Sequence, residues 1–219
     1  MRMRLATTGK NKVRMNYKTV DHRASAEIEV KKSVFIGNAA HVSTEEEAIA
    51  FVNEIRKTYP DARHNVYAYV LRENSAMRYS DDREPQGSAG MPVLDVIRKS
   101  GITDVVVTVT RYFGGILLGM GGLVRAYTDA AAAAVAEAGP VEIILSAVAR
   151  IVCSYSDYQK LLPRLEFFRG AVTDTVFDTD VTLTVSFPYE DISAVEEKLR
   201  DDTSGRASVS LICTEYKKW

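Results

Sequence analysis

The stretch "RYFGGILLGMGGLVRAY", from Arg111 to Tyr127, constrains the fold of this chain more than any other. It has five glycines in nine positions and an arginine on either side (Gly114, Gly115, Gly119, Gly121, Gly122; Arg111, Arg125). The apolar run "TDVVVTVTRYF" before it predicts a buried strand, and the alanine-rich segment 123–138 after it predicts a helix that packs closely on a sheet. The chain must therefore turn from strand to helix through glycines.

These glycines allow three interpretations. They permit positive φ and close packing of a helix on a strand, which is a structural role. Alternatively, the uncapped N–H groups at the start of the helix attract an anion, because no Ser, Thr, Asp or Asn precedes the helix. Arg125, expected in or near the first turn, opposes the helix dipole unless an anion compensates its charge or it points into solvent. A protein-recognition loop is the third interpretation.

Two nucleotide-binding motifs do not fit this spacing. Val124 stands where GxGxxG has its last glycine, and Met120 stands where the P-loop has lysine. The sequence therefore argues against a P-loop that hydrolyses nucleotides.

A second polar segment, "SDDREPQGSAGMP", runs from Ser80 to Pro92. Asp81, Asp82 and Glu84 offer oxygen ligands of the kind that Mg²⁺ takes, whereas a solvated acidic turn is the commoner structure for such a segment. A recognition surface shared with the glycine stretch is the third possibility. His64 has no nucleophile near it in sequence, so it does not by itself indicate catalysis.

Composition limits the class of protein. A chain of 219 residues with 46% apolar residues can bury one sizeable core or two small ones. It has no apolar run of the roughly 18 residues that cross a bilayer and no signal-peptide pattern, so we expect a cytoplasmic protein without a membrane segment. Five basic residues lie within residues 1–14, which we expect to be a disordered leader or extension. When these five basic residues are left out, the charge of the remaining sequence gives only weak support for a polyanionic partner.

Apolar periodicity predicts the elements of the first part. A β-like stretch spans Glu27–Val42, with Gly37 as a candidate bulge, and the capping-box spacing of Ser43 and Glu46 begins a helix that Pro60 stops. A strand follows at 65–72, then a polar loop at 73–90 and a helix that begins near Pro92.

Gly139-Pro140 marks the expected domain boundary, which divides the chain into residues 15–140 and 141–219. The second part has the order β-α-β-β-α-β of a ferredoxin-like sandwich, so the fold class is α+β. Alternation predicts that four apolar side chains face its helices (Val181, Leu183, Val185, Phe187). Cys153 and Cys213 lack zinc-ligand spacing and are expected to form a reduced, buried pair on neighbouring strands.

Several segments together resemble the YigZ/IMPACT family in its bacterial two-domain form. They are the glycine stretch, "YPDARHNVYAYVL", "SDDREPQGSAGMPVLDVI", "DTDVTLTVSF" and "TSGRASV". The resemblance implies a first domain like the β-α fold of a small-subunit ribosomal protein and of elongation factor G domain IV. The second domain would resemble the ferredoxin-like domain V of that factor. Eukaryotic relatives restrain an amino-acid-starvation kinase pathway by competing for its ribosome-associated activator.

The resemblance therefore implies a non-enzymatic, translation-associated regulator that binds RNA, the ribosome or a ribosome-associated protein, without a cofactor or a bound metal. The alternative is a metal-dependent enzyme that acts on a phosphorylated small molecule. Three positions depart from the family pattern: Leu117 replaces a lysine, Arg83 a glycine, and Met120 a small residue. The positions that match the family pattern are the candidate binding residues (Arg111, Gly114, Gly115, Gly119, Gly121, Gly122, Arg125, Asp81, Asp82, Glu84, Pro85).

Overall fold

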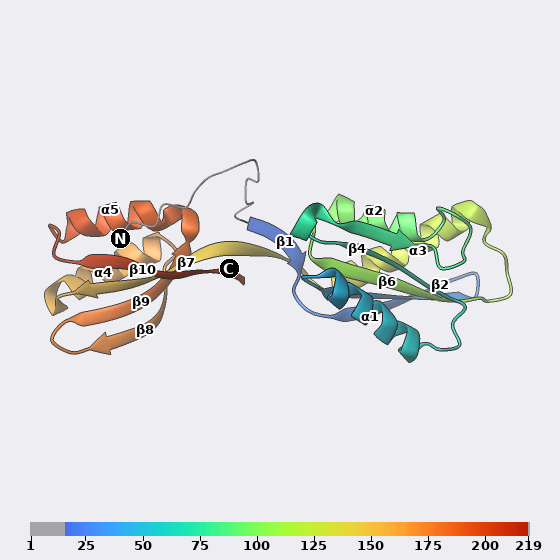
Figure 1. Cartoon of the computed structure of the whole chain (residues 1–219), viewed down its shortest axis with the longest axis horizontal. Helices are drawn as coiled ribbons and strands as arrows, with labels where there is room; N and C mark the ends of the chain where they lie inside the picture. Colours follow the sequence, from blue (N-terminus) through green and yellow to red (C-terminus); the bar gives the residue numbers. More distant parts are fainter. Residues whose placement is uncertain (1–15, 219) are drawn as a thin grey trace. The chain divides into compact units, whose positions relative to one another are not determined.

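The computed structural model describes residues 16–218, so the expected leader of residues 1–14 lies outside the described residues. The described chain is of the α+β class, with two antiparallel sheets and five α-helices. It divides into two compact units, Tyr17–Glu142 and the described residues from Ile143 onward (Figure 1). Between residues 16 and 218, no helix is long and apolar enough to cross a membrane.

The first unit is built on a five-stranded sheet in which every pairing is antiparallel. The strand order is β2-β3-β6-β4-β5, and β6 is the central strand. All residues of β6 except Tyr112 are buried, as its continuous apolar run predicts for a strand covered on both faces. The strand bounds are β2 Ala24–Val30, β3 Ser33–His41, β4 His64–Val70, β5 Met77–Ser80 and β6 Val105–Tyr112.

Helices cover both faces of this sheet. Helices α2 (Gly90–Ser100) and α3 (Gly119–Glu137) pack on one face of the sheet and enclose the larger core there. Helix α1 (Glu45–Thr58) packs on the other face. Gly37 is not a bulge, since β2 and β3 pair in continuous register past it. A Cβ there would lie 2.4 Å from the Ala130 carbonyl oxygen of α3, so the glycine lets the helix approach the strand.

Three local predictions for this unit were wrong in detail. The stretch 27–42 is two strands joined at Lys31-Lys32, both of which have positive φ. Thr44 caps α1, not Ser43, because its side chain accepts from the Glu47 N–H while Glu47 accepts from the Ser43 N–H. The predicted loop 73–90 contains a 3₁₀ turn and an edge strand (Glu73–Ser75, Met77–Ser80).

A further strand, β1 (Asn16–Val20), pairs with β7 (Pro140–Cys153).

The second unit has the predicted β-α-β-β-α-β order. Its strands lie in the order β10-β7-β9-β8, all antiparallel. The four predicted inward residues of β9 are fully buried among apolar side chains of two helices (Leu161, Leu165, Val195, Leu199). The element bounds are α4 Tyr155–Phe167, β8 Ala171–Phe177, β9 Val181–Pro188, a 3₁₀ turn Tyr189–Asp191, α5 Ile192–Asp202 and β10 Ser208–Lys218.

The expected buried cysteine pair was wrong for one partner. Cys153 is buried, and burial raises the pKa of its thiol, but Cys213 is exposed. The register of β10 against β7 shifts between Leu211 and Cys213, so Leu211 pairs with Ala149 and Cys213 pairs with Val148. The extra residue moves Cys213 to the other face of the sheet, because side chains alternate along a strand.

The ion pair between Arg206 and Asp157 makes the stability of the second unit depend on pH. Arg206 donates hydrogen bonds of 2.9 and 2.8 Å to the buried Asp157, and these bonds lower the pKa of that carboxyl to about 2. An unfolded aspartate titrates near 3.9. The pair therefore contributes stability above about pH 4, and this contribution is lost as the pH falls towards 2.

We expect Arg206→Met to lower the urea midpoint of the second unit at pH 6 and to make little difference near pH 2. The measurement is urea unfolding at pH 6, 4 and 2.5, followed by hydrogen exchange of the α4 amides. A wild-type to variant difference that does not change with pH would contradict this linkage.

Candidate functional site

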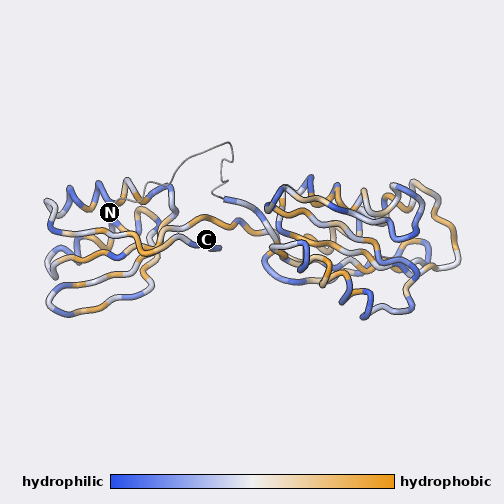
Figure 2. The backbone as a smooth tube through the Cα atoms, viewed as in Figure 1, coloured by the Kyte–Doolittle hydropathy of each residue, from blue (hydrophilic) through white to orange (hydrophobic). Residues whose placement is uncertain are grey.

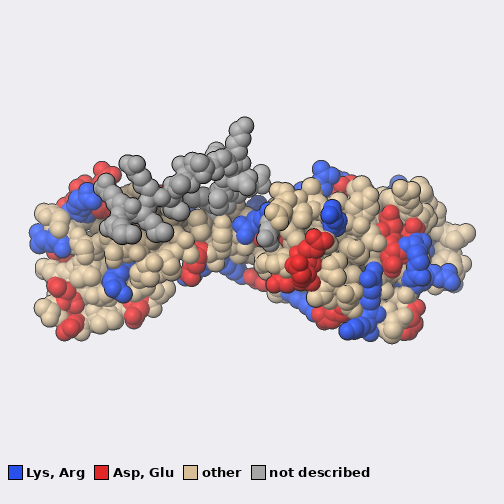
Figure 3. Space-filling view, viewed as in Figure 1, with Lys and Arg blue, Asp and Glu red and all other residues tan. Residues whose placement is uncertain are grey.

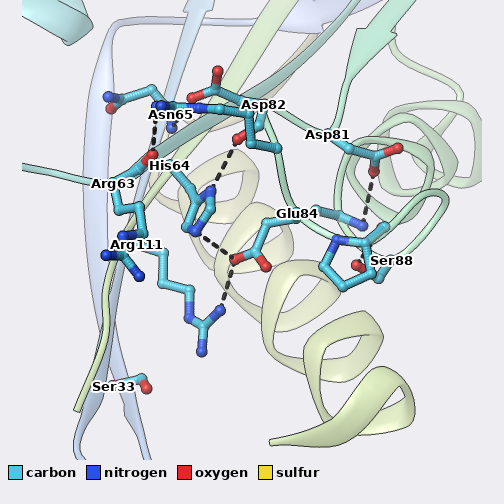
Figure 4. A network of polar contacts seen from close by, with 12 residues as sticks. Ser33, Arg63, His64, Asn65, Asp81, Asp82, Glu84, Ser88 and Arg111 are labelled. Atoms are coloured by element: carbon cyan, nitrogen blue, oxygen red, sulfur yellow. Dashed lines mark hydrogen bonds and ion pairs between the residues drawn. The ribbon is translucent and has the colours of Figure 1, made fainter. Parts of the chain in front are cut away.

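The carboxylate of Glu84 connects three elements at the end of the first sheet where β6 finishes. Its Oε1 accepts from Nη1 of Arg111, the penultimate residue of β6, at 2.7 Å, and from the hydroxyl of Tyr127 on α3 at 2.8 Å. His64 Nε2, at the start of β4, lies 3.9 Å from the same oxygen (Figure 4). The Glu84 and Arg111 side chains are only 4% and 8% exposed, so this is a buried ion pair.

Two further contacts stabilise this arrangement. The Arg111 guanidinium lies 5.5 Å from the ring centre of Phe35 and 5.6 Å from that of Phe113, within cation–π range. Burial, and then the Glu84 charge, raises the pKa of Tyr127, so its hydroxyl remains protonated and donates. Arg111 is thus committed to an internal carboxylate and is not free to meet an external anion.

Asp81 and Asp82 both hold the acidic loop in place. Asp81 Oδ1 accepts from the backbone N–H groups of Ala89 and Gly90 at 3.1 and 2.7 Å, so it caps α2 from nine residues before the helix begins. Asp82 Oδ2 accepts from the Asn65 N–H at 2.7 Å, and its carbonyl bonds to Nδ1 of His64 at 2.9 Å. The signal in the sequence was an aspartate close before a helix whose own N-cap residue, Ala89, cannot cap it.

The same contacts argue against a magnesium site, because they occupy the carboxylates that were its proposed ligands. Each of the three acidic side chains is bonded to protein donors. Among residues 16–218, no group of three His, Cys, Asp or Glu is placed to hold a metal ion. Pro85 belongs to the turn, where its carbonyl accepts from the Ser88 N–H and hydroxyl.

The glycine stretch forms an exposed loop followed by an uncapped helix. Helix α3 begins at Gly119, four residues earlier than the sequence predicts, and no side chain caps it. Arg125 is therefore the seventh helical residue and not part of the first turn; it is exposed and bonds to no described residue. The opposition between Arg125 and the helix dipole is consequently weaker than expected, because that effect fades beyond the first turn.

The five glycines serve different purposes. Gly114 is required by the fold, since a Cβ there would lie 2.0 Å from the Lys32 backbone, and its N–H donates to Ser33 Oγ at 3.1 Å. Gly115 and Gly119 have φ of 82° and 71°, where side chains are disfavoured. Gly122 has its nearest contact at 3.0 Å, the Leu118 Cβ. Gly121 has neither a positive φ nor a neighbour within 4 Å, so nothing in the described fold requires it.

We expect Gly114→Ala and Gly121→Ala to have opposite effects on stability. Gly114→Ala forces two backbones apart and should destabilise by about 1–3 kcal/mol. Gly121→Ala improves helix propensity and should stabilise by about 0.5–1 kcal/mol. Thermal unfolding of both variants checks this, and a loss of stability in Gly121→Ala would reveal a constraint that the structure does not show.

The loop between β6 and α3 also exposes apolar side chains, and Figure 2 colours it as hydrophobic. Phe113, Ile116, Leu117 and Met120 are 50%, 42%, 83% and 60% exposed. Leu117 and Met120 stand at two of the positions where the family resemblance implies a lysine and a small residue. Single exposed apolar residues are common, but four in eight positions beside free helix N–H groups indicate a contact surface.

Basic residues from four separate segments lie at this same end of the sheet. The β2–β3 turn abuts Gly114, His64 pairs with Arg111, and Arg83 Nη2 donates to the Arg63 carbonyl at 2.8 Å. The lysines and arginines of these segments are exposed, and none of them forms an ion pair with a described residue. Figure 3 shows lysines and arginines beside acidic side chains on one face of this unit. We call this set the basic end (Lys31, Lys32, Arg63, Arg83, Arg125). Lys31, Lys32 and Arg63 were missed by sequence reasoning, since no local motif connects them.

Breaking the buried pair should be costly. We expect Glu84→Ala to destabilise the first unit by about 3–5 kcal/mol, because it leaves the Arg111 charge buried without a partner. Chemical unfolding measures the loss, and Glu54→Ala serves as the matched control, since Glu54 forms an exposed pair with Arg23. Equal effects of the two variants would show that the buried pair has no special weight.

Fold and site together define a two-domain α+β protein with a structural acidic loop and an exposed apolar loop after β6. Comparison with protein families agrees with this division. Residues 31–135 match the Impact N-terminal domain, and residues 151–206 match a domain of unknown function, DUF1949. The chain belongs to the IMPACT family.

Similar proteins span most of the chain. It is 34% identical to the IMPACT family member YvyE of Bacillus subtilis over 195 residues, which cover 89% of this chain and 90% of that protein. It is also 34% identical to YigZ of Escherichia coli over 190 residues, 85% of this chain and 92% of that one. A crystal structure of a hypothetical protein, 31% identical, matches 91% of this chain and 98% of its own with a TM-score of 0.58.

The eukaryotic relatives share only part of this chain. The Protein IMPACT homolog of Saccharomyces cerevisiae is 33% identical over 100 residues, which cover 44% of this chain and 39% of that protein. The likeness to the bacterial family members is therefore the more extensive one.

Proposed function

We propose that this protein is a translation-associated regulator that binds RNA, and ribosomal RNA in particular, through the basic end of its first unit. The observation that carries the proposal is the charge arrangement there. The five basic side chains of the basic end have no ion-pair partners among described residues, and three acidic side chains of the adjacent loop (Asp81, Asp82, Glu84) are bonded inward. Helix α3 begins uncapped at Gly119. Lysine, arginine and free helix N–H groups are the donors that nucleic-acid phosphates take.

The apolar loop fits the same partner. Phe113, Ile116, Leu117 and Met120 offer exposed surface next to these donors. Unstacked RNA bases pack on aromatic and apolar side chains in single-stranded regions and loops. The family membership agrees with a role in translation, because the eukaryotic members that the sequence resembles are translation regulators.

The second unit offers less to RNA. The face of its sheet turned away from the helices carries Thr182, Thr184 and Arg150, whose side chains lie opposite the core residues; Arg150 pairs with Thr184 across β7 and β9. Among the described residues of β7 to β10, no aromatic residue occupies this face, so it lacks the stacking platform of sheet-based RNA-binding domains. We therefore assign the contact to the first unit.

The metal-dependent enzyme is the weaker candidate. Its proposed ligands are used to build the loop, and the described residues offer no substitute set. A binding function needs none of them to be free.

The proposal predicts that RNA affinity depends on the basic end and on salt. We expect the triple variant Lys31→Ala, Lys32→Ala, Arg125→Ala to bind ribosomes and RNA oligomers less tightly than wild type. The slope of log K against log salt should fall by roughly 0.7 for each phosphate that the variant no longer neutralises. Co-sedimentation and fluorescence anisotropy at two salt concentrations measure this.

Lys99→Ala is the control for charge removal, because Lys99 is exposed in the last turn of α2, just before the start of β6 and so at the opposite end of the sheet. Equal binding by the triple variant and wild type would refute the proposed surface. Weaker ribosome binding by the variant, without any binding of RNA oligomers by wild type, would instead indicate a ribosome-associated protein as the partner.

A further inference from the structure

An open pocket of about 400 Å³ lies within the basic end, lined by Arg63, His64, Arg83 and Glu84. Its volume is towards the lower limit of the roughly 300–1,000 Å³ typical of small-molecule sites. Its lining is polar and converges from two segments, the start of β4 and the acidic loop. The pocket therefore suits one small polar group.

Glu84 gives this pocket an unused acceptor. Its three contacts, with Arg111, Tyr127 and His64, all involve Oε1. Oε2 accepts from no described residue, although the side chain is only 4% exposed. Oε2 is accessible from the pocket and not fully buried, so it is available to a ligand that donates a hydrogen bond there.

Two arginines give the same pocket an excess of positive charge. Neither Arg63 nor Arg83 forms an ion pair with a described residue, and the Arg83 guanidinium donates to the Arg63 carbonyl. The Glu84 charge is balanced by Arg111 at 2.7 Å. The pocket therefore suits a ligand that carries an anionic group as well as a hydrogen-bond donor such as a hydroxyl.

Arg83 is held in a conformation that does not suit arginine. Its φ is 71°, in the left-handed region where glycine is the favoured residue. Glycine therefore suits this backbone position, and the Arg83 side chain lines the pocket while its Nη2 donates to the Arg63 carbonyl.

We propose that this pocket binds one ribonucleotide unit. Arg63 and Arg83 bind its phosphate, and its 2′-hydroxyl donates to Glu84 Oε2. The hydroxyl is the group by which a protein distinguishes RNA from DNA at one position. This inference rests on the proposed RNA-binding function, but it makes the separate claim that the pocket reads the sugar.

The test compares oligomers of the same sequence made of RNA, DNA and 2′-O-methyl RNA, in binding to wild type and to Arg83→Gly. Glycine suits the backbone at this position, so the variant should melt no lower than wild type. We expect wild type to prefer RNA over the other two by about tenfold, the scale of one hydrogen bond to a charged group. Arg83→Gly should bind RNA about tenfold more weakly and lose most of this preference.

Lys32→Gly is the matched control. Lys32 also has a positive φ, 65°, and carries the same charge, but it does not line the pocket. Removal of the Lys32 side chain should weaken the binding of all three oligomers alike and leave the preference for RNA unchanged. Equal affinity of wild type for RNA and DNA, or a preference that survives Arg83→Gly, would overturn the proposal.

A second arm separates this proposal from the proposed function. AMP and dAMP are titrated against both proteins by isothermal calorimetry. If no oligomer binds but AMP binds wild type more tightly than dAMP, and Arg83→Gly abolishes this, the pocket is a site for a free ribonucleotide and only RNA binding fails. If RNA binds but without the 2′-hydroxyl preference, RNA binding stands and the pocket proposal fails.

Discussion

The ion pair between Glu84 and Arg111 determines how the functional end of the first unit is built. Burying two charges removes their hydration, and this loss is offset only when geometry and additional hydrogen bonds are good. Here the Tyr127 hydroxyl supplies one such hydrogen bond, and the two flanking rings lie within cation–π range of Arg111, whose Nε has no hydrogen-bond partner among described residues. One carboxylate thus fixes the acidic loop to the central strand and to α3, and so it places the glycine-rich loop.

This commitment of the acidic side chains has an electrostatic consequence. Asp81 and Asp82 accept from backbone amides, and Glu84 is paired with Arg111, so these three carboxylates are bonded within the protein. The lysines and arginines of the basic end have no ion-pair partners among described residues. A chain with a net charge of −1 thus has exposed basic side chains that no carboxylate pairs. Net charge alone gives little indication of such a surface.

Glycine and left-handed backbone have two roles at this end. Gly114 and Gly37 have neighbours that no side chain could tolerate, so they belong to the packing of the sheet. Gly121 and Arg83 have no such explanation within the described chain. The proposed contact with RNA offers a reason for the arginine at this left-handed position. Within the glycine stretch, Gly114 is thus required by packing and Gly121 is not.

Local patterns in the sequence determined most of the elements. The apolar run of β6, the alternation of β9 and the closing glycine of α2 depend on neighbours within a few residues, so they could be predicted, as could the α+β class and the family. Most candidate residues at the turn and in the acidic loop also followed from their spacing. Their roles did not, because the sequence does not show which side chain meets which.

Tertiary structure decided those roles. It paired Arg111 with Glu84, 27 positions apart in the sequence, and it placed the Asp81 carboxylate at the N-terminus of α2, which it caps. One inserted residue in β10 turned Cys213 outward. The antiparallel register of the sheet brought Lys32 and Arg63 to the end of β6, where Arg83 bonds to the Arg63 carbonyl. Periodicity records only which face of an element is apolar, whereas charge pairing and pocket formation depend on contacts that form once the sheet has closed.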